Sequence, residues 1–248
     1  MGLDYSIGDG RGHGRATINE YLMAAPGWPS VSVLLTYADV LIGVAASTRT
    51  SPRISVTASL SVYLTGPLEG GGAIEMPCHL TKSGRTVTVG ETEILTDDGR
   101  PLGVAIGTFQ ASPRPQDTLS PRMTQGHRME RIESPHPTLA DHVGLEVVEP
   151  GLTRIGLRPD LLNGTQSLQG GLVALLAEAA AQSAATADRA TAAVVEGIEV
   201  HYLAAARVGP IQARAERVGP DLYRVTAHDT GMDDRIVCLV VARTREVG

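Results

Sequence analysis

Two acidic residues stand inside apolar stretches of this sequence that have helical spacing. Asp39 falls within the predicted helix 30–46, and Glu178 falls within the predicted helix 169–185. A carboxylate in largely apolar surroundings loses hydration, which raises its pKa and suits it to act as a general base. Either acid can instead simply accept a hydrogen bond from a neighbouring strand or from another part of the chain, and the sequence leaves both explanations open.

Two glycines, Gly170 and Gly171, open the second of these helices. The first N–H groups of a helix have no partner within it, and the helix dipole favours negative charge there. A glycine pair at this point leaves the N–H groups accessible to an oxygen that gains negative charge during a reaction. The alternative is structural, because glycines also allow the start of a helix to pack closely on a strand.

The two helices belong to halves of the chain that look like copies of one unit. Each half is predicted to contain a short strand, one helix and four long strands, in that order. Matched residues also keep a nearly constant separation, as a duplication requires. The separation is 139 positions for Asp39 and Glu178, for Val56 and Val195, and for Tyr63 and Tyr202, and 135 positions for Gly84 and Gly219 and for Asp98 and Asp233.

The predicted elements leave one segment between the halves. This segment is dense in proline, serine and charged residues and lacks apolar periodicity. The sequence therefore predicts a first domain over residues 1–112, a linker over 113–142 and a second domain over 143–248. The predicted strands are 15–19, 53–64, 72–81, 86–96 and 102–110 in the first half and 144–157, 192–204, 208–217, 222–229 and 235–243 in the second.

Composition excludes several kinds of partner. Hydrophobic residues make up 42% of the 248 residues and aromatic residues only 3%, so the chain can build a core but offers few stacking platforms for nucleic acid. The net charge is −6 without a basic block, which also argues against nucleic acid. Uninterrupted apolar runs fall well short of the roughly 20 residues that cross a membrane. We therefore expect a cytoplasmic protein without membrane or nucleic-acid partners.

The cysteines and histidines offer no metal site. Cys78 and Cys238 lie far apart in strand-like runs, which predicts buried free thiols in a reducing compartment. No histidine lies at ligand spacing from another ligand-type residue, so no metal is expected.

The second half contains the motif NGTQSLQGG at 163–171 followed by LAE at 176–178. This motif resembles the signature of acyl-CoA thioesterases of the phenylacetic-acid-pathway type. In the first half, the segments 60–64, 84–85, 98–102 and 107–109 resemble the later strands of that family. The resemblance implies an α+β double hotdog fold, in which each of two curved antiparallel sheets wraps a central helix. In this chain Gln169 replaces the family's histidine, the first half lacks the glycine pair, and Ala24 stands where Asn163 stands in the second half.

The same resemblance implies a thioester hydrolase that acts on a small-molecule acyl-CoA and needs no cofactor beyond the coenzyme A of its substrate. In related hotdog dimers the helix start of one copy meets the acid of the other. By that analogy Gly171 serves a site with Asp39, and Glu178 faces the other helix start at Ser32. The first pair is the preferred site because glycine leaves the better oxyanion donor.

Three further residues have roles that depend on the resemblance. Asn163 is expected to order the attacking water or the acid, and Gln169 to donate a hydrogen bond to the thioester oxygen. Gly170 and, in the first half, Ser32 are expected to contact the substrate. The acid of either site could act as a general base or as a nucleophile, and one of the two sites could be degenerate.

Other functions remain open at this point. The segment from Glu178 to Gln182 is similar to the glutamate-containing helix of the β-hydroxyacyl dehydratases, but the histidine that those enzymes need is absent between His142 and His201. A non-catalytic acyl-CoA-binding module would use the same groove without turnover, and a purely structural scaffold would leave both acids unexplained. The tandem chain could also pair into a homodimer through sheet edges or helix faces.

Overall fold

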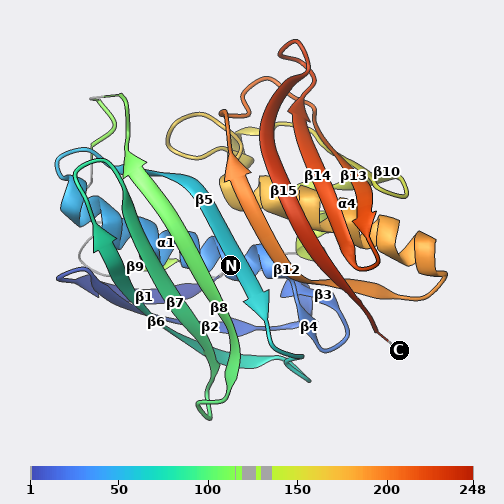
Figure 1. Ribbon diagram of the computed structural model, residues 1–248, viewed down its shortest axis with the longest axis horizontal. Coiled ribbons are helices and arrows are strands. Elements are labelled where there is room, and N and C mark those ends of the chain that lie inside the picture. The colour runs from blue at the N-terminus through green and yellow to red at the C-terminus, as the bar shows by residue number, and fades with distance from the viewer. Residues whose placement is uncertain (1, 115, 119–126, 130–135, 248) are drawn as a thin grey trace.

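The fold is seen in a computed structural model that describes residues 2–114, 116–118, 127–129 and 136–247. Most strands in this part of the chain join one antiparallel sheet, and two 20-residue helices lie on one side of it (Figure 1). The helices are α1 (Val31–Thr50), α3 (Leu139–Val143) and α4 (Gly170–Arg189), with 3-10 turns η1 (Glu20–Leu22) and η2 (Pro159–Leu161). Strands of the first half are β1 (Leu3–Gly8), β2 (Arg11–Ile18), β3 (Met23–Ala25), β4 (Trp28–Pro29), β5 (Ser55–Leu64), β6 (Gly72–Ser83), β7 (Thr88–Thr96) and β8 (Pro101–Ala111). The others are β9 (His127–Met129), β10 (Glu146–Glu149), β11 (Leu152–Ile155), β12 (Ala193–Tyr202), β13 (Ile211–Gly219), β14 (Leu222–Asp229) and β15 (Arg235–Glu246).

The two halves of the sheet have equivalent strand orders when each is read outward from the centre. It runs β10-β11-β13-β14-β15-β12-β5-β8-β7-β6-β2-β1-β9, so β12 and β5 pair at the centre and each half continues with equivalent strands. Leu60 pairs with Val200 and Ser61 with Glu199. Since Leu60 and Glu199 are 139 positions apart, as are Ser61 and Val200, the symmetry axis passes between these pairs. The sheet thus has the symmetry that the sequence separations predict.

Each half wraps its sheet around one long helix, as the resemblance implies (Figure 1). Helix α1 packs on β5, β6 and β8, and α4 packs on β11, β12 and β13. Apolar residues surround α1 on nearly all sides, and most of its side chains are buried. Burial of aliphatic surface from both helices supplies the main stabilisation of each half.

One helix has the length and composition of a membrane span. By length and composition, helix α1 could cross a membrane, although each uninterrupted apolar run within it is too short to do so. Its most apolar window is 72% buried inside the protein, which is typical of a core helix. Among the described residues no other helix meets these criteria.

The start of each half differs from the predicted single strand. In the first half, β1 and β2 form a hairpin whose turn places Asp9 and Gly10 at positive φ, as a two-residue hairpin turn requires. In the second half, β10 and β11 replace the predicted strand 144–157. The Asp9-Gly10 pair is the sequence signal for this hairpin.

The predicted linker also contributes to the fold. Strand β9 pairs with β1 and extends the edge of the first half, and α3 begins at a Thr138 cap whose hydroxyl accepts from the N–H of Asp141. Both cysteines are buried free thiols, as predicted. Burial raises the pKa of Cys78 and of Cys238 to about 12, so both are protonated at neutral pH.

Candidate active site

The two long helices meet so that the start of each lies beside the other. The first turn of α1 donates hydrogen bonds to Glu178 on α4. The first turn of α4 lies against Thr36 on α1, one helical turn from Asp39. Each acid therefore lies near the start of the opposite helix, in the crossed arrangement that the analogy with hotdog dimers predicts.

The Glu178 side chain is only 2% exposed, and both of its oxygens are occupied. Oε1 accepts from the backbone N–H of Val31 at 3.0 Å. Oε2 accepts from the N–H of Ser32 at 3.0 Å and from the hydroxyl of Ser30 at 2.7 Å. Burial raises the pKa of Glu178, and the hydrogen bonds from α1 lower it by less. The carboxylate thus occupies the N–H groups that an oxyanion would need at this helix start.

Glu178→Gln is expected to reduce the free energy of unfolding by about 1–3 kcal/mol, because the amide nitrogen would face a donor that then lacks an acceptor. Urea unfolding at neutral pH measures the change. The matched control is Glu146→Gln, which removes an exposed ion pair with Arg154 and should cost under about 1 kcal/mol. Equal stability of the Glu178→Gln variant and the wild type would show that these hydrogen bonds do not hold the helices together.

Asp39 has a different environment. Its side chain is partly buried, and Oδ1 accepts a hydrogen bond from the Thr57 hydroxyl of β5 at 2.6 Å. Burial raises the pKa of Asp39, and the Thr57 hydrogen bond lowers it by less. Burial raises the pKa of Tyr202 on β12, and the negative charge of Asp39 raises it further. The Tyr202 hydroxyl donates to the carbonyl oxygen of Gly170 at 3.0 Å.

The start of α4 has open donors. Within the described part of the chain, the N–H groups of Gly170 and Gly171 have no hydrogen-bond acceptor. The two amides therefore keep the free donors and the helix-dipole field that favour an anionic oxygen. The contacts of Gly170 with Tyr202 and of Gly171 with Thr36 keep this helix start on the Asp39 side of α1.

Both glycines also have a structural role. A Cβ on Gly171 would lie 2.0 Å from the Thr36 hydroxyl oxygen, and one on Gly170 would lie 3.2 Å from that of Tyr202. The close approach predicted for the pair is therefore real, but for Gly171 the neighbour is a helix rather than the strand that was expected. Gly170 and Gly171 therefore both allow close packing at the start of α4 and provide the open N–H donors there.

The remaining predicted residues divide into three cases. Ser32 lies in the Glu178 cradle, where its hydroxyl is 2.8 Å from that of Ser30. Asn163 uses its side-chain oxygen within its own loop, accepting from the N–H and hydroxyl of Thr165 at 2.8 and 2.7 Å. This contact shapes the loop before α4 and ties the oxygen to the turn rather than to an acid. Gln169 directly precedes α4 and is partly buried, and its side chain forms no hydrogen bond to the described residues.

Sequence reasoning missed the residues that touch the acids from other elements. Ser30, Thr57 and Tyr202 are common residue types at unremarkable positions, and Tyr202 drew notice only as a marker of the duplication. A serine at the helix start was the one available signal, because serine is favoured at that position. Thr57 and Tyr202 depend on how the sheet pairs around the helices.

A cavity of about 600 Å³ lies beside Glu178. Its walls come from α4 between Leu175 and Ala187, from residues 21–24 before α1, and from α3 of the predicted linker. Most of the lining is aliphatic, and the side chain of Gln182 donates to the carbonyl of Ala24 at 3.2 Å across the two halves. The described residues contain no cluster of side chains that could hold a metal ion.

Comparison with known proteins agrees with this architecture. Residues 32–102 match the family model of the Thioesterase superfamily. An acyl-ACP thioesterase from Bacteroides thetaiotaomicron is 12% identical with a TM-score of 0.64, covering 95% of this chain and 98% of its own. A tesB protein from Mycobacterium avium subsp. paratuberculosis is 17% identical with a TM-score of 0.59, covering 99% of this chain and 96% of its own.

A third solved structure is a protein of unknown function with a hot dog fold from Alicyclobacillus acidocaldarius, at 12% identity and a TM-score of 0.50, covering 98% of this chain and 96% of its own. At identities this low, the structural similarity shows that these proteins share the fold of this chain. A comparison with curated protein sequences finds no match. The chain therefore has a double hotdog fold, and its first half carries a match to the Thioesterase superfamily.

Proposed function

We propose that this protein hydrolyses acyl thioesters where α1 and α4 meet, with Asp39 as the general base and the N–H groups of Gly170 and Gly171 as oxyanion donors. The observation that carries the proposal is the difference between the two helix starts. At α1 the donors are occupied by Glu178, whereas at α4 they are open and lie on the same side of α1 as an acid. The match to the Thioesterase superfamily supports thioester hydrolysis in general.

The proposed reaction uses one water molecule. Asp39 takes a proton from the water as its oxygen bonds to the thioester carbonyl carbon, and the carbonyl oxygen becomes an oxyanion held by the amides of α4. The tetrahedral intermediate then collapses, the carbon–sulfur bond breaks, and the proton passes to the leaving thiolate. Products are a carboxylic acid and a free thiol, and the step needs no cofactor.

Neighbouring side chains have supporting roles in this proposal. Tyr202 holds the carbonyl of Gly170 and so positions the first turn of α4. The side-chain amide of Gln169, which has no hydrogen-bond partner among the described residues, is available to donate to the thioester oxygen, in the place of the family's histidine. Asn163 keeps the preceding loop in shape. We propose acyl-CoA as the substrate and a cytoplasmic location, in keeping with the two buried free thiols.

Hydrolysis is expected to increase with pH through an apparent pKa above the ordinary aspartate value of about 3.9, because burial raises the pKa of Asp39 and only the ionised form accepts a proton. The pH profile of kcat measures this. Thr57→Val removes the hydrogen bond that stabilises the ionised carboxylate and should shift the profile to higher pH. A profile that does not move in this variant would argue against Asp39 as the base.

A panel of acyl-CoAs with short, medium, long and aromatic acyl groups tests the reaction itself. Release of free thiol is followed alongside hydration of an enoyl-CoA, which would identify a hydratase. The proposal predicts thiol release from at least one member and no hydration. Hydration without thiol release, or binding to every member without turnover, would contradict it.

A second candidate function is binding of an acyl chain without turnover, and the cavity beside Glu178 favours it. The cavity has the size and the mainly aliphatic lining of ligand sites, and the amides at its end are already occupied. Such binding can coexist with hydrolysis at Asp39, since the two acids lie at different helix starts.

Ala179→Phe tests that candidate by filling the cavity from α4. A thioether analogue of a medium-chain acyl-CoA, which cannot be hydrolysed, is titrated calorimetrically. Two equivalents per chain are expected for the wild type and one for Ala179→Phe, with Ala192→Phe on an exposed turn as the matched control. A single equivalent in all three proteins would rule out a separate acyl site at Glu178.

A further inference from the structure

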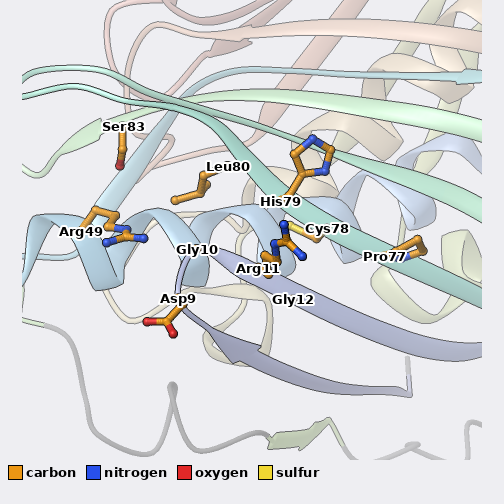
Figure 2. Close-up of a pocket in the computed structure, with 10 residues that line it drawn as sticks. All are labelled: Asp9, Gly10, Arg11, Gly12, Arg49, Pro77, Cys78, His79, Leu80 and Ser83. Atoms are coloured by element: carbon orange, nitrogen blue, oxygen red, sulfur yellow. The ribbon is translucent and has the colours of Figure 1, made fainter.

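A second cavity lies at the other end of α1 and has a different chemical character (Figure 2). It encloses about 560 Å³ between the β1–β2 turn, the last turn of α1 and strand β6. Two arginines, Arg11 and Arg49, line it together with His79 and Ser83. Figure 2 shows the guanidinium groups of the two arginines on either side of Gly10.

Among the residues that the structure describes, no carboxylate or carbonyl accepts a hydrogen bond from Arg11 or Arg49. The second half shows the contrast, because Arg189 in the last turn of α4 pairs with Asp221 at 2.6 Å and also donates to Thr244. An arginine thus lies in the last turn of each long helix, but within the described residues only Arg189 has hydrogen-bonded partners.

The local backbone makes room for the Arg49 side chain. A Cβ on Gly10 would lie 3.1 Å from a terminal nitrogen of the Arg49 guanidinium, and Gly10 has a φ of +72°. Glycine at this position therefore allows the guanidinium to lie against the β1–β2 turn. The turn is fixed to β6 because the N–H of Leu80 donates to the carbonyl of Gly10 at 2.8 Å.

Among the described residues that line this cavity, Asp9 is the one acid. These lining residues therefore carry a formal charge of +1, in a protein whose net charge is −6. His79 is 2.9 Å from Glu91, which does not line the cavity. Cys78 is present as a neutral thiol because burial raises its pKa to about 12.

We propose that this cavity binds a phosphate group through Arg11 and Arg49. Guanidinium groups match phosphate oxygens in paired, charge-assisted hydrogen bonds, and a doubly charged group uses both arginines. Arg49 is ten residues from Asp39, about 15 Å along α1, so the site is separate from the proposed thioester site. Its ligand is either the nucleotide end of coenzyme A or a separate phosphorylated molecule.

The test measures binding of pyrophosphate, coenzyme A and dephospho-coenzyme A by calorimetry at low salt. Arg49→Gln and Arg11→Gln are each expected to weaken binding by at least about tenfold. Arg235→Gln is the matched control, since it removes the same charge from an exposed residue outside the cavity, and it should change binding less than about twofold. Asp9→Asn should strengthen binding, because it removes the competing carboxylate.

The ligands distinguish the two sources of phosphate. If coenzyme A displaces pyrophosphate and binds more tightly than dephospho-coenzyme A, the nucleotide end of coenzyme A is the ligand. If pyrophosphate binds with this arginine dependence and coenzyme A does not displace it, the ligand is a separate phosphorylated molecule. The proposal is overturned if none of the three ligands binds at millimolar concentration, or if the cavity variants bind as the Arg235→Gln control does. Thiol release is measured separately, so either proposal can fail without the other.

Discussion

Asp39→Asn is expected to lower kcat for thioester hydrolysis by about 10²–10⁴-fold, the contribution that a positioned general base usually makes. The asparagine keeps the size of the side chain and can still accept the Thr57 hydrogen bond, but it cannot take a proton from water. The measurement is the initial rate of thiol release under saturating acyl-CoA. KM should change little, because the carboxylate acts on the water rather than on the acyl group.

The variant must be shown to be folded. Its urea unfolding midpoint should lie close to that of the wild type, because burial of the neutral amide costs less than burial of the charge that it replaces. A folded Asp39→Asn protein that retains most of its hydrolysis rate would remove Asp39 from the reaction.

Gly171→Ala is expected to lower kcat by about 10²-fold and to destabilise the protein by about 1–3 kcal/mol. The added Cβ would lie 2.0 Å from the Thr36 hydroxyl oxygen, so the start of α4 must shift away from α1. A shift of about 1 Å in groups that position a reacting oxygen can cost this much rate. Thiol release and urea unfolding of the same preparation measure both effects.

A double variant separates packing from chemistry at this position. Thr36→Ala removes the hydroxyl that the new Cβ would meet, although the Thr36 Cβ itself would remain 3.1 Å away. Combined with Gly171→Ala, it should recover part of the stability and part of the rate. Gly156→Ala is the control, since a Cβ there meets nothing within 4 Å and should leave both quantities unchanged. If Gly171→Ala alone matched this control, close packing at the start of α4 would not matter for the reaction.

The fold could be predicted to a large extent because apolar periodicity and the duplication agree. Constant separations of 139 positions predicted which elements correspond, and the symmetric strand order follows the same correspondence. Both helices begin within one residue of their predicted start. They continue to Thr50 and Arg189, beyond the predicted ends, because polar residues in the last turns remain compatible with helix when one face stays buried.

The linker was harder to predict. Its composition indicated a connector, but tertiary pairing makes β9 an edge strand beside β1 and packs α3 over the cavity near Glu178. Short elements of this kind depend on contacts with distant strands rather than on their own periodicity. Strand β9 and the first residues of α3 thus lie within the segment 113–142.

Of the candidate site, the sequence predicted only that the start of each long helix lies near the acid on the other one. The crossed relation of Glu178 with Ser32 followed from the resemblance, and the structure has the hydrogen bond. The sequence did not indicate that the longer glutamate side chain occupies its helix start while Asp39 is held by Thr57 on a strand. The two acids differ by one methylene group, and their hydrogen-bond partners depend on where the strands lie beside the helices. No pattern in the sequence indicates those positions.

The most direct measurement compares thiol release by Asp39→Asn and Glu178→Gln on one acyl-CoA under identical conditions, with both proteins shown to be folded. The account predicts that the first variant loses at least about 99% of the wild-type rate, while the second stays within a few-fold of it. The reverse result, with activity lost at Glu178 and kept at Asp39, would contradict the assignment of the reaction to the open start of α4.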